Sequence, residues 1–161
     1  MKRIKGLVYL TVILFLVSGC TNINTESKSI VLNIPNVDKY TFLYVQGVDK
    51  DGDIVPYEGA SEGIKDHEKI KTFISKVNKL EAVRKPGKEL TDKVKELNNP
   101  GNYMFILSDT EEMDNIAYSI NFYKDGTMQF EDPDKNEIVY VSKEKHPKLL
   151  KELKTLLEIT Y

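Results

Sequence analysis

Residues 102–142 contain the pattern that most restricts the fold of this chain, which is a series of short strand-like segments separated by polar turns. The segments are 102–108, 115–123, 127–131 and 137–142. The apolar positions of the second segment alternate with smaller or polar ones, and they are Ile116, Tyr118, Ile120 and Phe122. A period of two places one face of a strand in a core and the other toward solvent. These residues therefore predict an antiparallel sheet with one buried face.

Two other segments have a helical period. In residues 66–80 the apolar side chains recur every three or four positions, and Asp66 is a suitable N-cap. In residues 147–157 Pro147 suits the first helical position. An apolar stripe follows it, made of Leu149, Leu150, Leu153, Leu156 and Leu157. Residues 90–97 are expected to add one or two helical turns.

The order of these elements defines a fold class. Strand-like segments at 29–34 and 40–48 precede the first helix, and residues 53–58 could return as a further strand. Pro56 cannot donate to a ladder, so that strand belongs at an edge or ends early. The order is strands, helix, strands, helix, with short turns. We predict an α+β fold, an antiparallel sheet built from hairpins with two main helices packed on one face.

The first twenty residues form a leader. Lys2, Arg3 and Lys5 precede an apolar run at 7–17, and small residues lead to Cys20. This pattern is typical of a secretory signal, and the apolar run is too short to span a membrane. Cys20 is the single cysteine of the chain, so no intrachain disulfide can form. A free thiol would also be unusual in an exported protein.

The sequence VSGC that ends at Cys20 resembles the lipobox of bacterial lipoproteins. The resemblance implies that the Cys20 thiol carries a diacylglyceryl group and that cleavage leaves Cys20 as the first mature residue. An ordinary signal peptide or an uncleaved anchor is the alternative. We expect a lipoprotein signal peptide at 1–19, a lipidated N-terminus and polar tether at 20–29, and one α+β domain at 30–161. The protein would then sit on the extracytoplasmic face of the cell membrane.

The charge of the chain bears on its partners. There are 23 basic and 25 acidic residues, and residues 1–19 hold three basic and no acidic ones. The mature part therefore carries 20 basic and 25 acidic residues, a net charge of −5. An acidic body does not suit nucleic acid or anionic lipid headgroups. Because the charge is spread along the chain, we interpret it as a contribution to solubility.

Residues 48–58 are the strongest candidate for a metal site. An EF-hand calcium loop aligned on Gly52 would take ligands from positions that hold Gly47, Asp49, Asp51 and Glu58. Gly47 has no side-chain ligand, and the flanks are strand-like rather than helical. A second Lys-Asp-Gly sequence at 124–126 lacks the surrounding acids. Asp-Gly is favoured in two-residue hairpin turns, which need positive φ, so we predict a hairpin tip without metal.

The remaining candidate sites are incomplete. Residues 131–137 lack the glycine and the last ligand of a calcium loop, and the acidic residues of 108–115 are typical of a solvated loop. His67 and His146 have no thiol to join them in a metal site. Ser142 and Lys145 match the S-x-x-K signature of serine acylation, but the companion motifs are absent. We therefore predict no catalytic residue, no metal and no cofactor.

Four tyrosines raise the alternative of a binding surface. If they gathered on one open sheet face, they could bind a partner, because tyrosine is common in binding surfaces. The other interpretation is that they are half-buried in strands with hydrated hydroxyls. The four are Tyr44, Tyr103, Tyr123 and Tyr140.

Residues 64–157 resemble small lipoproteins of Gram-positive bacteria, in particular the YhfM-like group, in the order of a helix (67–79), a hairpin (120–130), a strand and a terminal helix. That group has no established activity, so the resemblance implies none. We expect a non-catalytic binding module that meets an envelope protein and is not an enzyme. An exclusion or immunity lipoprotein would be a narrower form of this binding module. The alternative is a small envelope enzyme or ligand-binding protein.

Overall fold

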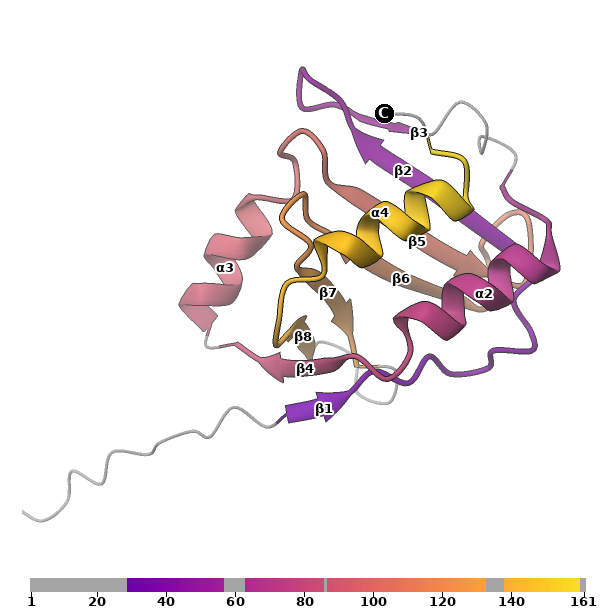
Figure 1. The fold of residues 1–161 in the computed structure, drawn as a ribbon, viewed down its shortest axis with the longest axis horizontal. Helices are drawn as coiled ribbons and strands as arrows, with labels where there is room; N and C mark the ends of the chain where they lie inside the picture. Colours follow the sequence, from indigo (N-terminus) through magenta and orange to yellow (C-terminus); the bar gives the residue numbers. More distant parts are fainter. Residues whose placement is uncertain (1–28, 57–62, 86, 133–137, 160–161) are drawn as a thin grey trace, which may run out of the picture.

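The computed structural model describes residues 29–56, 63–85, 87–132 and 138–159. Within these ranges the chain has an α+β fold, in which eight strands form one antiparallel sheet accompanied by three helices (Figure 1). The order of strands across the sheet is β1-β4-β8-β7-β6-β5-β2-β3. None of the helices in these ranges is long and apolar enough to cross a membrane.

The strands in chain order are β1 (Ser29–Val31), β2 (Phe42–Val48), β3 (Ile54–Pro56), β4 (Glu81–Arg84), β5 (Tyr103–Ser108), β6 (Ala117–Phe122), β7 (Met128–Glu131) and β8 (Val139–Ser142). The helices are α2 (His67–Val77), α3 (Gly87–Lys95) and α4 (Pro147–Leu156). The strands β5 to β8 pair in sequence order, and β1 and β3 form the two edges.

The register of β5 and β6 gives the sheet two distinct faces. Phe105 lies opposite Ile120, and both side chains are fully buried. The residues beside them, Ile106 and Ser119, point to the other face and remain partly or fully exposed. We call the first the core face and the second the outer face. The predicted alternation in β6 is present, and its apolar positions lie on the core face.

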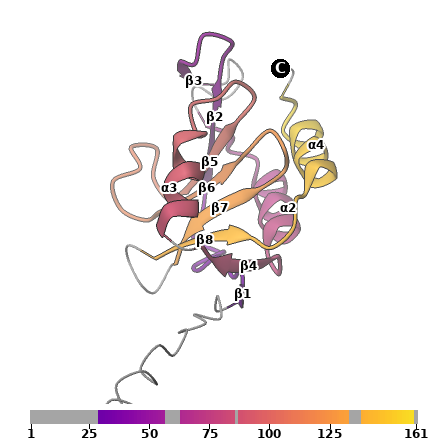
Figure 2. The ribbon, with the colours of Figure 1, turned by 90° about the vertical axis from the view of Figure 1, so that its left-hand side faces the viewer.

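Helices α2 and α4 begin where the sequence indicates. One carboxylate oxygen of Asp66 accepts hydrogen bonds from the backbone nitrogens of Glu68 and Lys69, at 2.9 and 3.2 Å. Pro147 opens α4, as its fixed φ favours. Both helices contribute to one hydrophobic core, through Ile70, Phe73, Ile74 and Val77 of α2 and through Leu150 and Leu153 of α4. Figure 2 shows α2 and α4 next to each other.

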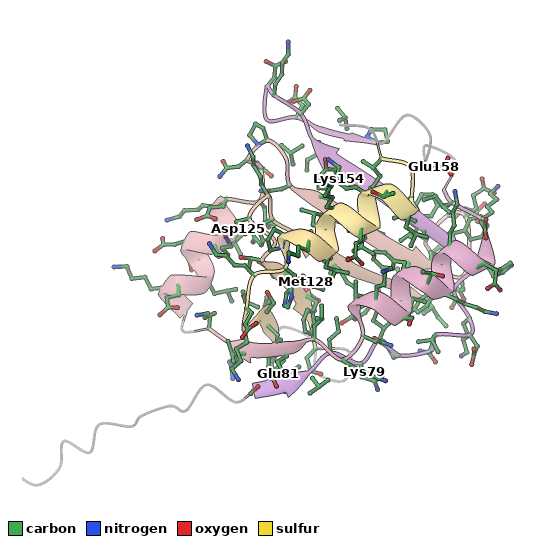
Figure 3. The ribbon with its side chains drawn as sticks, in the orientation of Figure 1. Lys79, Glu81, Asp125, Met128, Lys154 and Glu158 are labelled. Atoms are coloured by element: carbon green, nitrogen blue, oxygen red, sulfur yellow. The ribbon has the colours of Figure 1, made fainter. Side chains whose placement is uncertain are left out.

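Ion pairs also join α2 to the end of the chain. Lys76 pairs with Glu152 at 2.7 Å, and Lys69 pairs with Glu158 at 2.8 Å. Figure 3 labels Glu158 just beyond the end of α4. By contrast, α3 contains no buried residue. It is therefore a surface helix, held by a few polar contacts.

The main differences from the prediction are one missed strand and the bounds of α3 and β1. Strand β4 was not predicted, because it is short and follows α2 closely, with Ala82 as its fully buried residue. Helix α3 starts at Gly87 and ends at Lys95, whereas the sequence suggested 90–97. Strand β1 begins at Ser29, the residue at which we expected the tether to end, and it stops at Val31.

The two Lys-Asp-Gly sequences form the same turn, and it has three residues rather than the two that we predicted. The backbone nitrogen of Asp49 donates to the carbonyl of Asp53 at 3.0 Å, and that of Tyr123 donates to the carbonyl of Thr127 at 2.8 Å. Each pair encloses Lys, Asp and Gly, and the glycines have φ of +87° and +86°. A three-residue turn that ends in a left-handed glycine gives this pattern.

Replacing Leu153 with alanine is expected to lower the free energy of unfolding by about 2–5 kcal/mol, because its side chain is fully buried in the core. Leu156→Ala is the matched control, since Leu156 on the same helix is only partly buried. Urea denaturation of both variants measures the difference. A Leu153→Ala protein as stable as wild type would show that the leucine stripe of α4 contributes little to the stability of the core.

Candidate functional site

The side chain of Asp49 holds the acidic loop at 49–53 closed. One side-chain oxygen of Asp49 accepts hydrogen bonds from the backbone nitrogens of Asp51 and Asp53, at 2.9 and 3.0 Å. Such a local bond is typical of an aspartate that begins a turn. Glu58, the last ligand of the alternative calcium loop, lies outside the described residues. Within the described ranges, no group of three or more His, Cys, Asp and Glu side chains is placed to hold a metal ion.

The acidic loop between β5 and β6 is also closed by its own hydrogen bonds. Asp109 accepts from the side-chain amide of Asn115 at 2.6 Å and from the backbone nitrogen of Ile116 at 2.9 Å. Asp114 accepts from the hydroxyl of Thr110 at 2.8 Å. These carboxylates shape the loop. The similar sequence at 131–137 falls mostly on residues 133–137, outside the described ranges.

Ser142 is held in a structural role. Its Oγ accepts a hydrogen bond from the backbone nitrogen of Met128 at 3.0 Å and donates to the carbonyl of Glu144 at 2.7 Å. The residue is buried at the end of β8, and Lys145 forms an ion pair with Asp125 at 2.9 Å instead of activating it. The geometry is that of a strand end. It does not place a nucleophile beside a base, which serine acylation requires.

Asp125 is the carboxylate with the most perturbed environment in the described part of the chain. Burial would raise its pKa, but hydrogen bonds from Thr127 and Lys145 and the charge of Lys93 outweigh this and hold the pKa below the usual range. Asp125 is therefore ionised at neutral pH. A catalytic acid requires the opposite, a raised pKa, so this carboxylate fits a structural role in the turn.

Neither histidine belongs to a metal-binding cluster in the part of the chain that the structure describes. His67 is exposed in the first turn of α2, and His146 immediately precedes α4. The Nε2 atom of His146 is buried and has no hydrogen-bond partner among the described residues. Cys20, the expected lipidation site, lies outside those residues.

The four tyrosines do not gather on one face, so that interpretation is wrong. Tyr103 and Tyr140 lie on the core face, whereas Tyr44 and Tyr123 lie on the outer face. All four side chains are at most 9% exposed, so they are also more buried than the half-buried alternative implied. Tyr123 is covered by Lys93 of α3, whose ammonium nitrogen lies 4.1 Å from the ring centroid.

An apolar strip runs along the outer face on β2 and β5. The register places Tyr44 opposite Ile106, and Gln46 opposite Met104, on adjacent strands. Phe42, Ile106, Met104 and Gln46 are partly exposed, whereas the core-face residues between them are buried. We call these five residues, Phe42, Tyr44, Gln46, Met104 and Ile106, the outer strip.

Local contacts fix the aromatic end of the outer strip. The rings of Phe42 and Tyr44 stack with their centroids 6.2 Å apart and an angle of 10° between planes. The Tyr44 hydroxyl donates to the carbonyl of Glu111 at 2.7 Å. Lys65 lies over the Phe42 ring, 5.4 Å from its centroid, and its ammonium nitrogen is 3.4 Å from the Glu111 carboxylate. Burial raises the pKa of Tyr44, and Glu111 adds to the effect, so the hydroxyl stays a donor.

The other end of the outer strip opens into a small hollow of about 80 Å³. Gln46, Met104 and Asn121 line it together with Ile54, which is 55% exposed on the edge strand β3. The strip therefore extends from two stacked aromatic rings to an apolar edge. On β6 its border is polar or small, with Ser119 and Asn121 beside it.

Sequence reasoning missed Phe42, Met104 and Ile106. A signal was present, because the positions that alternate with buried residues are apolar in 40–48 and 102–108 but small or polar in 115–123. A strand with apolar side chains on both faces either has both faces covered or presents one to a partner. Choosing between these requires the positions of the helices.

A charged cleft of about 520 Å³ lies between α3 and β8. Its lysines are already paired: Lys145 with Asp125, Lys143 with Glu81 at 2.7 Å, and Lys93 with Glu96 at 2.8 Å. The pKa of Asp125, which also lines the cleft, is lowered. Each lysine that lines the cleft is thus paired with a carboxylate.

Comparisons with known protein families, with curated proteins and with solved structures gave no match, so the residues of this chain carry the functional argument.

Proposed function

We propose that this protein is a lipoprotein held on the extracytoplasmic face of the cell membrane and that it acts as a non-catalytic binding module. The outer strip is its contact surface, and its partner is an envelope protein. One observation carries this proposal: the strip leaves large apolar side chains partly exposed on β2 and β5. Apolar patches with a polar border are typical of protein interaction sites.

The architecture proposed for the module is a sheet built from hairpins, with α2 and α4 packed on the core face. Two observations support it. Consecutive strands from β5 to β8 pair with each other, and the buried side chains of α2 and α4 belong to the same core cluster. In this arrangement the two helices stabilise the sheet and leave the β2–β5 part of the outer face available to a partner.

The membrane anchor in this proposal is the lipid on Cys20. Its support is the leader sequence, in which a basic start and an apolar run end at VSGC. Two acyl chains hold a protein on a bilayer stably, because each buried methylene contributes about 0.8 kcal/mol. The first described strand begins at Ser29, nine residues after Cys20. The module would therefore work close to the membrane surface.

In-cell photo-crosslinking tests the contact surface. A photoreactive amino acid at Gln46, which is partly exposed in the outer strip, is expected to capture a discrete partner. Adding Ile106→Asp should reduce the yield about tenfold or more, because one central apolar contact can carry 2 kcal/mol or more of binding energy. Val31→Asp is the matched control, since Val31 is an apolar residue that is 56% exposed on the opposite edge strand, β1.

Thermal melts of the purified variants must show that Ile106→Asp remains folded. If the crosslink yield is the same in the Ile106→Asp and wild-type proteins, the outer strip is not the contact surface. An equal loss in the Val31→Asp protein would contradict the proposal as well, because β1 lies at the edge of the sheet opposite to β2 and β3.

A further inference from the structure

The charges of this protein are segregated in space, although they look evenly spread in the sequence. We call residues 66–79 and 147–158, which contain α2 and α4, the helix layer. It holds seven lysines and four acidic residues, a net charge of +3. The other residues from 21 to 161 hold 13 basic and 21 acidic residues, a net charge of −8. One basic surface therefore lies on an otherwise acidic body.

The four acidic side chains of the helix layer already have partners within that layer. Glu152 and Glu158 pair with Lys76 and Lys69, and the Asp66 carboxylate caps α2. Glu68 lies 3.8 Å from Lys71. In the described part of the chain, Lys148 and Lys151 form no ion pair. Both are exposed on the first turns of α4.

Lys148 and Lys151 border a groove of about 610 Å³ between α2 and α4, which is also lined by Lys76, Glu152, Thr155 and Leu156. Leu156 contributes apolar surface to its wall, and the exposed Lys148 and Lys151 carry charge at its border, whereas the Lys76 ammonium group pairs with Glu152. Lysine stems cover apolar surface in this way while their charges stay hydrated. An apolar groove with a cationic border suits the headgroup region of an anionic lipid.

We propose that the helix layer docks on the anionic phospholipid surface of the membrane that holds Cys20. This inference rests on the proposed anchor, which keeps the domain close to the bilayer. The nine residues from Cys20 to Lys28 can span at most about 30 Å. A domain of this size has a radius of gyration of about 14 Å, so the helix layer can reach the surface.

The contact is electrostatic and reversible. The chain has no tryptophan, the residue that most often anchors proteins at a membrane interface. Each lysine near an anionic surface contributes about 1 kcal/mol, an effect that falls off within a Debye length of about 8 Å at physiological ionic strength. Because the sheet separates the helix layer from the outer strip, docking turns the strip toward the envelope.

The overall acidity of the chain led us to expect that anionic headgroups do not suit this protein. The proposed docking revises that expectation for the helix layer alone.

Lysine labelling on vesicles tests the docking. Every described helix and strand lies after Cys20, so the chain 20–161 contains the whole fold. Its single thiol can be coupled to a maleimide lipid, which reproduces the tether without the cellular pathway. On vesicles with phosphatidylglycerol, acylation of Lys148 and Lys151 should slow about threefold or more relative to phosphatidylcholine vesicles. Lys88 on α3 should not change, and high salt should remove the difference.

The double variant Lys148→Glu/Lys151→Glu gives the second measurement. In the wild-type protein, Lys71, which is exposed on α2, should also be labelled more slowly on phosphatidylglycerol vesicles, and this protection should be lost in the variant. The control Lys50→Glu/Lys88→Glu changes the net charge equally at exposed sites outside the helix layer, and it should keep the protection.

Equal labelling on the two kinds of vesicle would overturn the proposal, and so would an equal loss of protection in the control variant. The thiol coupling replaces the natural lipid, and the vesicles contain no envelope protein. Failure here is therefore distinct from failure of Cys20 lipidation or of the outer strip, which are tested separately.

Discussion

Gly126→Ala is expected to destabilise the protein by about 3 kcal/mol or more, because this position combines a strained backbone with a direct clash. Gly126 has φ of +86° and ends the turn between β6 and β7. A Cβ atom built there would lie 2.5 Å from the carbonyl carbon of His146 and would also overlap the nitrogen of Pro147. The backbone nitrogen of His146 donates to the Gly126 carbonyl at 2.8 Å, so the turn supports the start of α4.

The second Lys-Asp-Gly turn is a natural control for this prediction. Gly52 has nearly the same φ, +87°, but the nearest atom to its Cβ position is the carbonyl oxygen of Asn98 at 3.5 Å, an ordinary contact. Gly52→Ala should therefore carry only the left-handed strain, about 1–2 kcal/mol. Urea denaturation of the two variants separates strain from clash. Equal losses would mean that the chain around Pro147 moves aside at little cost.

The pair of turns also shows what sequence reasoning can and cannot predict. The repeat of Lys-Asp-Gly correctly predicted positive φ at both glycines, because few other residues adopt it. The length of the turn was wrong, since two-residue and three-residue hairpin turns share the Asp-Gly preference. The close contact with α4 at Gly126 was invisible, because it joins segments that are distant in sequence.

Elements with a strong apolar periodicity were predicted from the sequence, whereas an element without one was missed. The helix at 66–80 was clear because four buried apolar residues share one stripe and Asp66 caps it. The short strand β4 was missed because a four-residue segment shows no usable alternation, and its pairing with β1 and β8 holds it in the sheet. Tertiary pairing, more than local preference, defines such a strand.

The two proposed contact surfaces were harder to predict than the elements. The outer strip depends on the register of β2 and β5, which places Phe42, Tyr44, Met104 and Ile106 on one face. The basic helix layer depends on α2 and α4 lying together, although nearly 70 residues separate them in the chain. A net charge averages over such surfaces. It excludes a uniformly basic protein but says nothing of one basic face.

Cys20→Ser is expected to abolish lipidation completely, because the proposed acceptor is the only thiol in the chain. Wild-type protein from membranes should begin at Cys20 and carry the mass of a diacylated N-terminus. The variant should keep residues 1–19 and carry no lipid. Mass spectrometry of the intact protein is the decisive measurement. Fractionation alone is insufficient, since an uncleaved leader with an apolar run at 7–17 could also keep the variant at the membrane.

A shifted thiol provides the control for this experiment. Cys20→Ser combined with Thr21→Cys keeps one cysteine but moves it by one residue relative to VSG. If the lipobox resemblance is meaningful, this protein should also remain without lipid, because the thiol no longer follows Gly19. Lipid on the shifted cysteine would point to a general reactivity of the thiol. A wild-type protein without lipid would remove the anchor, and with it the reason to expect the helix layer close to a membrane.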